Sequence, residues 1–224
     1  MKATKLTDKI LLIEFPTRKE MTLTMFRIQE FYEGKEGIKG CYFTPDQFID
    51  AYSDEKGDID YFSYWDGFNV PTDIIFDFAK KFTMPEMGRV GLSIRECNII
   101  KEIYENIQEQ SGYLITIVEG DEITLKHEMA HAYFFTDAEY RGAALVILSS
   151  IPLVIREKLR QALLKSDYCE EVVNDEIQAY LTAYDKEEWA ELFPDIAEGE
   201  IKEYSAKLQV LLVNKREKVK WQSV

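Results

Sequence analysis

The 224-residue chain contains two histidines, and they lie four residues apart in the segment HEMAH at positions 127–131. On an α-helix, residues at this spacing lie one turn apart on the same face, so both imidazoles can bind a single ion. The glutamate between them points too far round the helix to be a third ligand, but it can reach a water molecule held by the ion. This H-E-x-x-H spacing is typical of a helix-borne zinc site. We therefore predict zinc bound by His127 and His131, with Glu128 as a general base.

The residues on either side of the motif are largely apolar, with Ile123 to Leu125 before it and Ala132 to Phe135 after it. A helix with this composition should be buried. A buried histidine pair beside a carboxylate needs polar partners, because burying polar groups without them costs free energy. A metal ion supplies such partners. The alternative is a coincidental motif, with the histidines hydrogen-bonded in a core and Glu128 in solvent.

The charge balance excludes some classes of partner. The chain has 27 basic and 41 acidic residues, a net charge of −14, and a pI near 4.7. Such a surface repels nucleic acid and anionic lipid, so we expect neither as a partner. The sequence gives no indication of an oligomeric state.

Cysteine spacing and apolar runs indicate a soluble, cytoplasmic protein. Cys41, Cys97 and Cys169 are widely spaced and form no C-x-x-C pair, which argues against a disulfide framework or a thiolate zinc site. The longest apolar stretch, Ala143 to Ile155, is interrupted by two serines and a proline. It is too short to span a bilayer, and we expect a helix–turn–helix there.

The hydrophobic patterns predict an α+β protein with a zincin-like fold. Residues 1–122 should form a mixed part with a small sheet, and residues 123–224 an all-helical part that carries the zinc ligands, both sharing one core. Strands are expected at 9–15, 41–43 and 113–118, and an aromatic-rich strand leading into a loop at 58–69. Capping patterns predict helices beginning near Thr17, Thr44, Ser93, Thr136, Pro152 and Asp167, with further helices at 71–82 and 196–221.

A catalytic zinc normally takes three protein ligands and leaves a fourth position for water. With both histidines used and no thiolate indicated, the third ligand should be a carboxylate. Asp137 lies six residues after His131, where some zincins with an extended motif place this ligand. Those chains bend at a glycine three residues after the second histidine, where this chain has Phe134. The helix should therefore continue past Phe134, leaving Asp137 at the first turn of the next helix.

The region from Tyr113 to Ala183 resembles the gluzincins, the zincins of thermolysin-like topology. The resemblance rests on the H-E-x-x-H helix, the strand before it and the segment NDEIQA at 174–179, where a glutamate is followed three positions later by a small residue. It is closest to the compact, single-domain gluzincins and to regulatory intracellular peptidases with an E-x-x-A element. It implies that Glu176 is the third zinc ligand, with Ala179 letting the two ligand helices approach closely. The alternatives to Glu176 are Asp137, Asp175, Glu170 and Glu171.

Two further roles follow from this resemblance. Larger thermolysin-like enzymes stabilise the oxyanion with another histidine, and this chain has none left. The hydroxyl of Tyr180 could take that role or bond a histidine ligand, although a tyrosine packed in the core is an equal alternative. The resemblance also places residues 113–118 as an edge strand that pairs with an extended substrate. Ile115 and Ile117 would then contact the substrate, unless the strand is interior.

These expectations combine into a zinc metallopeptidase that acts on a peptide or protein substrate. Zinc on two imidazoles and a carboxylate would lower the pKa of its water toward neutrality, and Glu128 would pass the proton to the leaving amine. The alternative is a zinc-binding regulatory or toxin-system protein of zincin fold with slow, conditional or no hydrolysis. A structural zinc in a non-catalytic protein is disfavoured, because such a site has no use for Glu128.

Overall fold

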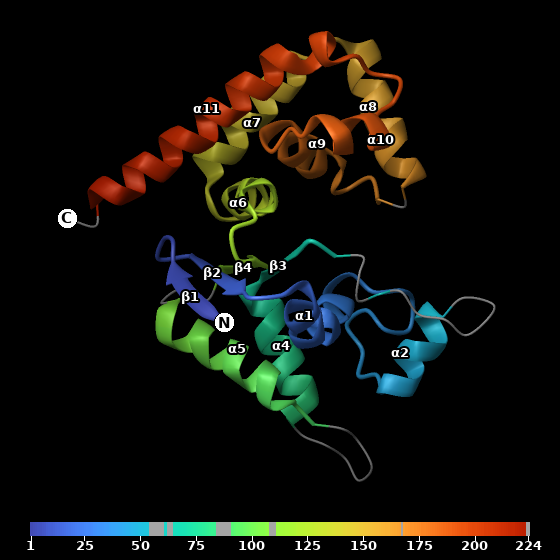
Figure 1. Cartoon of the computed structure of the whole chain (residues 1–224), viewed down its shortest axis with the longest axis vertical. Helices are drawn as coiled ribbons and strands as arrows, with labels where there is room; N and C mark the ends of the chain where they lie inside the picture. The colour runs from blue at the N-terminus through green and yellow to red at the C-terminus, as the bar shows by residue number, and fades with distance from the viewer. Residues whose placement is uncertain (54–60, 62–64, 84–90, 108–110, 167, 223–224) are drawn as a thin grey trace. The chain divides into compact units, whose positions relative to one another are not determined.

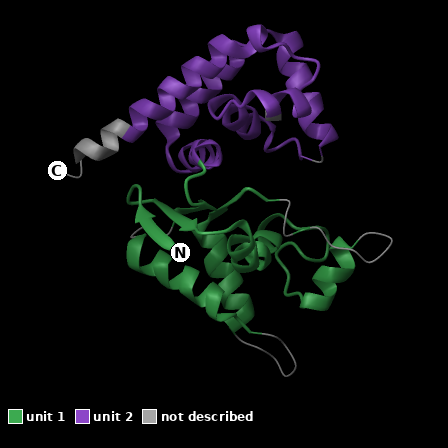
Figure 2. Cartoon of the chain, in the orientation of Figure 1, with its two compact units in different colours: residues 1–121 green, residues 122–224 purple. Residues whose placement is uncertain are grey.

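The computed structural model describes residues 1–53, 61, 65–83, 91–107, 111–166 and 168–222. The chain forms two compact units, Met1–Asp121 (unit 1) and Glu122–Val224 (unit 2), which are coloured separately in Figure 2. Unit 1 contains the sheet, and the described part of unit 2 contains only helices. The predicted α+β composition, with strands confined to the N-terminal half, is therefore confirmed.

Unit 1 contains a four-stranded mixed sheet. Its strands are β1 (Lys2–Lys5), β2 (Ile10–Phe15), β3 (Gly67–Pro71) and β4 (Tyr113–Val118), in the order β1-β2-β4-β3 (Figure 1). β2 and β4 run parallel, while β1 and β3 pair antiparallel with their neighbours. The two apolar runs of the sequence, ILLIEF and YLITIV, form the two interior strands. Continuous apolar runs are typical of strands buried within a sheet.

Helices of unit 1 pack against this sheet and against each other. They are α1 (Arg18–Glu33), α2 (Pro45–Tyr52), α4 (Thr72–Thr83) and α5 (Ile94–Asn106). The side chain of Thr17 caps α1, and complete capping boxes at Thr44 and Ser93 begin α2 and α5, as the sequence predicts. α1 packs against β2, β3 and β4 and against α4 and α5. The core of unit 1 therefore forms around α1.

Unit 2 is a group of helices with α9 at its centre. Its helices are α6 (Glu122–Thr136), α7 (Ala138–Ser149), α8 (Leu153–Lys165), α9 (Val173–Thr182), α10 (Lys186–Leu192) and α11 (Glu198–Gln222) (Figure 1). α9 packs against α6, α7, α8 and α11. Its buried side chains include Ile177, Ala179 and Leu181. The α6–α9 pair positions the candidate site.

The structure differs from the sequence-based prediction at three elements. No strand forms at 41–43, because the chain turns at Gly37 and Gly40, which have φ angles of 87° and 67°. Phe43 then packs against Phe82 with ring centroids 5.8 Å apart, instead of pairing with a strand. The helix expected from about residue 167 begins only at Val173, and β1 was not predicted. Most of the aromatic segment at 58–69 lies outside the described residues, and its end belongs to β3.

The apolar stretch from Ala143 to Ile155 is the predicted helix–turn–helix. α7 ends at Ser149, α8 begins at Leu153, and the two helix axes differ by 114°. Among the described residues, no single helix is both long and apolar enough to cross a membrane. α7 and α8 reach that length and hydropathy only when this bent pair is taken together.

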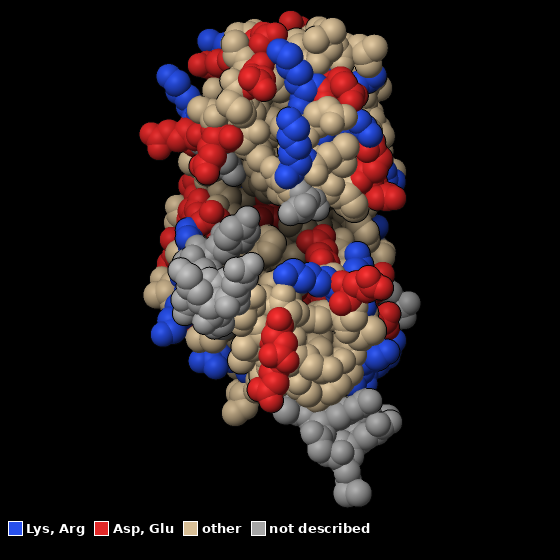
Figure 3. Space-filling model, turned by 90° about the vertical axis from the view of Figure 1, so that its right-hand side faces the viewer, with Lys and Arg blue, Asp and Glu red and all other residues tan. Residues whose placement is uncertain are grey.

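Acidic and basic side chains are interspersed on the face drawn in Figure 3 rather than segregated into patches of one sign. Several charged side chains of the described residues form exposed ion pairs within their own unit. In unit 2, for example, Arg160 contacts both Glu157 and Glu170. Exposed pairs of this kind contribute about 0–1 kcal/mol each to stability. The charges on this face therefore do not indicate a particular partner.

Candidate metal centre

α6 presents His127 and His131 on the same face, one turn apart. Their Nε2 atoms lie 3.0 Å apart, and their ring centroids 4.8 Å apart. α6 continues through Phe134 to Thr136, as predicted from the absence of a glycine after the motif. The local helical geometry alone therefore brings the two imidazole nitrogens together.

Glu176 approaches the histidine pair from α9. Its Oε2 lies 3.9 Å from His127 Nε2 and 3.7 Å from His131 Nε2. Two ligand atoms, each about 2.1 Å from a tetrahedral ion, lie about 3.4 Å apart. The three separations at this site lie on either side of that value, so His127, His131 and Glu176 could hold a metal ion. Two imidazoles and one carboxylate suit zinc and other divalent transition metals.

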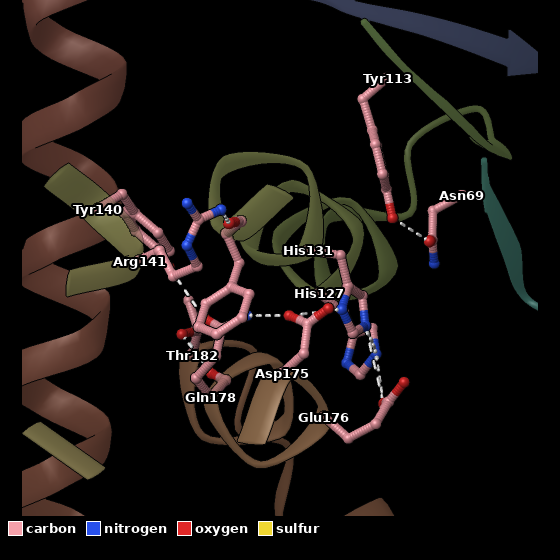
Figure 4. A network of polar contacts seen from close by, with 11 residues as sticks. Asn69, Tyr113, His127, His131, Tyr140, Arg141, Asp175, Glu176, Gln178 and Thr182 are labelled. Atoms are coloured by element: carbon pink, nitrogen blue, oxygen red, sulfur yellow. Dashed lines mark hydrogen bonds and ion pairs between the residues drawn. The ribbon is translucent and has the colours of Figure 1, made fainter. Parts of the chain in front are cut away.

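Asp175, which precedes Glu176, fixes the orientation of His131. Its Oδ1 lies 3.0 Å from His131 Nδ1, on the opposite side of the ring from the site (Figure 4). A carboxylate at this distance accepts the Nδ1 proton, which leaves the Nε2 lone pair directed toward His127 and Glu176. A carboxylate behind a histidine ligand is a common arrangement in metal sites. Asp175 therefore supports the ligand set without belonging to it.

The two histidines have opposite pKa shifts. Burial, and then the nearby His131, lower the pKa of His127 well below its ordinary value. Burial would also lower the pKa of His131, but the charges of Asp175 and Glu176 outweigh it and raise that pKa. Without a metal ion, His127 is therefore neutral, and His131 carries the one additional proton and its positive charge. A divalent ion would replace this proton, because an imidazole ligand must be deprotonated at the bonding nitrogen.

Glu128 is buried, with 6% of its surface exposed. Its charge is among the causes that raise the pKa values of His131 and of Tyr168, so its carboxylate lies near both. This placement differs from the alternative of a glutamate in solvent. Glu128 therefore lies beside the metal centre, where a proton-transferring base would act.

Tyr180 also lies at the site, together with a tyrosine that the sequence did not single out. The Tyr180 ring packs edge-on against His127 with the ring centroids 4.7 Å apart. Its hydroxyl lies 2.9 Å from that of Tyr168. Burial, and then the charge of Glu176, raise the pKa of Tyr168, so this hydroxyl keeps its proton. The site therefore contains two adjacent tyrosine hydroxyls that can donate hydrogen bonds.

The other candidate ligands have different roles. Asp137 caps α7 by accepting from the Tyr140 amide at 2.9 Å, and it forms an ion pair with Lys215 at 2.8 Å. The sequence predicted a helix beginning at Thr136 with Asp137 in its first turn, and the structure instead makes Asp137 itself the N-cap of α7. Glu170 binds the guanidinium of Arg160 through both of its oxygens, and Glu171 is exposed. None of the three joins the group formed by His127, His131 and Glu176.

The edge-strand role expected for Ile115 and Ile117 is wrong. β4 is an interior strand, paired with β2 along one side and with β3 along the other. Its backbone groups are therefore not available to a substrate strand. The side chains of Ile115 and Ile117 are buried, with 0% and 1% exposed. They belong to the core of unit 1.

Sequence reasoning missed Tyr168 and the supporting role of Asp175. Tyr168 is one of thirteen tyrosines and belongs to no motif, so no sequence signal distinguished it. Asp175 was considered only as an alternative ligand. Its position beside Glu176 could have indicated its role, because residues at i and i+1 of a helix point in different directions and cannot easily bind one ion together.

Comparisons of the chain with known protein families, with curated proteins and with solved structures found no match. The chemistry available to the chain is therefore judged from its own side chains. These include three donors that could hold a metal ion, a buried carboxylate beside them and two tyrosine hydroxyls. Such a set can hold a cation, accept a proton and donate hydrogen bonds to an oxygen.

Proposed function

We propose that the chain is a zinc-dependent metallopeptidase related to the compact gluzincins, with a zincin-like fold. The observation that carries the proposal is the convergence of His127, His131 and Glu176 from two packed helices, beside the buried Glu128. The first three residues would hold zinc. The substrate would be a peptide or a protein.

Each side chain would have a distinct role in hydrolysis. When bound, zinc supplies Lewis-acid polarisation and brings the pKa of water close to neutrality. Glu128 accepts a proton from the attacking water and gives it to the leaving amine. The Tyr168 hydroxyl donates a hydrogen bond to the substrate carbonyl oxygen as negative charge develops on it, and the Tyr180 hydroxyl, 2.9 Å away, orients that of Tyr168. Asp175 keeps His131 in the tautomer that leaves its Nε2 free.

The composition of the site favours catalysis over a structural metal. Structural zinc sites usually have four protein ligands, whereas catalytic sites have three and keep one position open. Within the described residues, the group that could hold an ion has three members. Burying the carboxylate of Glu128 next to the ligands costs free energy. A role as general base would explain why a carboxylate lies there.

The decisive experiment compares the wild type with Glu128→Gln. The wild type should bind one zinc ion per chain and hydrolyse members of a peptide library. Glu128→Gln should bind the same amount of zinc and lose hydrolysis, because it removes the base and keeps all three ligands. Glu122→Gln, an exposed glutamate at the start of the same helix, serves as the matched control and should remain active.

Each outcome of this comparison bears on a different part of the proposal. A zinc-loaded Glu128→Gln variant with wild-type activity would show that another group is the base. A wild type that binds zinc but cleaves no peptide would refute the peptidase and leave a zinc-binding protein. Elemental analysis without zinc after reconstitution at neutral pH would refute the whole proposal.

A further inference from the structure

Behind the metal centre, a chain of buried polar side chains connects His131 to α7. The chain runs from His131 through Asp175 and Gln178 to Tyr140 (Figure 4). Gln178 and Tyr140 are fully buried, with 0% of their surfaces exposed. Neither residue is in the ligand set or near the reacting atoms. A buried glutamine is costly unless its amide is fully hydrogen-bonded, so its partners indicate what it does.

The partners of Gln178 fix the direction in which its amide points. Because a carboxylate can only accept, Gln178 must turn its Nε2 toward Asp175 and its Oε1 toward α7, where the oxygen accepts from the Tyr140 hydroxyl at 3.1 Å. Gln178 Nε2 then faces Asp175 and donates to its Oδ1 at 2.9 Å. The same Oδ1 lies 3.0 Å from His131 Nδ1. One carboxylate oxygen is therefore held between two N–H donors, one of which belongs to a candidate metal ligand.

We infer that Gln178 and Tyr140 are positioning residues that hold Asp175 in the rotamer that binds His131 Nδ1, and so direct His131 Nε2 toward the metal. Without the Gln178 amide, Asp175 keeps a single partner here, and it is partly exposed to solvent, with 26% of its side chain accessible. It could then rotate toward water. His131 would lose the acceptor that sets its tautomer and ring orientation. This inference rests on the proposed zinc site and extends it from α6 and α9 to a third helix, α7.

α7 contributes no ligand, but it should still affect metal binding through Tyr140. Tyr140 lies in the first turn of α7, where its amide donates to the capping Asp137 at 2.9 Å. The N-terminus of α7 therefore fixes the tyrosine whose hydroxyl orients Gln178. Loss of partners behind a metal-bound histidine typically weakens metal affinity or activity by about 10–100-fold.

The test measures zinc affinity, by competition with a chelator, for the wild type, Gln178→Met and Tyr140→Phe. Methionine keeps the length and helix propensity of glutamine but removes its hydrogen bonds. We expect Gln178→Met to weaken zinc binding by about 10–100-fold. Tyr140→Phe should have a smaller effect, because Asp175 keeps its Gln178 donor. Gln29→Met is the matched control, since Gln29 is a buried glutamine in unit 1, and it should bind zinc like the wild type.

A second readout separates positioning from simple packing. Since the chain has two histidines, nitrogen-15 spectra of the zinc-loaded protein report directly on the His131 imidazole. The Nδ1 proton of His131 should exchange with water faster in Gln178→Met than in the wild type. Because the exchange rate is measured on the zinc-loaded protein, a lower stability of the metal-free protein would not by itself explain faster exchange. If Gln178→Met does not fold, zinc affinity and Nδ1 proton exchange are measured for Tyr140→Phe instead, which keeps the aromatic ring and removes only the hydroxyl. Those two measurements then test the inference.

The outcomes distinguish this inference from the proposed function. If the variants bind zinc with wild-type affinity and exchange the Nδ1 proton at the wild-type rate, then Gln178 and Tyr140 only join α7 to α9. In that case the inference fails while the zinc site stands. If the wild type binds no zinc, both the inference and the proposed function are overturned.

Discussion

The Nε2 atoms of His127 and His131 face each other across 3.0 Å from successive turns of α6. Two imidazole lone pairs at this distance repel each other unless a hydrogen-bonding proton or a metal ion lies between them. The carboxylate of Glu176, 3.7 Å from His131 Nε2, increases the preference for a cation. A proton on His131 can supply that charge, and a divalent metal ion can replace it. The local electrostatics thus favour one bound cation.

Replacing Glu176 should weaken metal binding more than replacing any nearby carboxylate outside the site. We expect Glu176→Ala to lose zinc affinity by orders of magnitude, because two imidazoles alone form an incomplete site. Glu171→Ala, an exposed glutamate just before α9, is the matched control and should bind like the wild type. Zinc titration of both variants checks this prediction. Equal affinities would exclude Glu176 as the third ligand.

Asp137→Asn should reduce stability without affecting zinc binding. Burial would raise the pKa of Asp137, but hydrogen bonds from Lys215 and from the Tyr140 amide lower it. A carboxyl with a lowered pKa in the folded state stabilises the fold at a pH above its unfolded pKa of about 3.9. This stabilisation is lost as the pH falls through the folded value.

Asparagine keeps the helix cap and removes the charge. The variant should therefore lose up to about 1 kcal/mol of unfolding free energy at pH 7, and the difference should narrow as the pH falls below about 4. Urea unfolding of the metal-free protein across this pH range measures the effect. A loss of zinc affinity in Asp137→Asn would instead identify Asp137 as a ligand.

Tyr168→Phe should impair turnover more than substrate binding. A hydroxyl that stabilises developing negative charge acts mainly in the transition state, and loss of one such donor lowers kcat by about 100–1,000-fold. Tyr180→Phe should have the smaller effect, because the Tyr180 hydroxyl, 2.9 Å from that of Tyr168, orients its neighbour. Steady-state kinetics at verified zinc content test both variants. Wild-type kcat in both would exclude the pair from catalysis.

Ile115→Val should affect stability and leave the kinetics unchanged. Ile115 lies in the interior strand β4 and is fully buried, so removing a methylene group should cost about 0.5–1.5 kcal/mol of unfolding free energy. Ile94→Val, at a side chain that is 82% exposed, should change stability by less than about 0.5 kcal/mol. Denaturant unfolding and KM measurements distinguish the two effects. A rise in KM without loss of stability would restore the substrate-contact role of Ile115.

Features that depend on neighbours in the chain could be predicted from the sequence. The histidine pair is an example, because the helical repeat by itself brings residues four apart together. The caps at Thr17, Thr44 and Ser93 are others, since each cap bonds an amide three residues further on. The apolar run at 113–118 likewise predicted β4 with its correct bounds.

Features that depend on which distant segments pack together required the tertiary structure. The position of β4 is one, because an apolar run indicates a strand but not which strands pair with both of its sides. The choice of Glu176 among several acidic residues is another, since it depends on how α9 packs across α6. Tyr168 and Tyr140 also reach the site and its supporting network through packing between separate helices. The sequence by itself therefore determined the histidine pair and the glutamate beside it, and tertiary packing decided which distant carboxylate joins the pair and which groups orient the histidines.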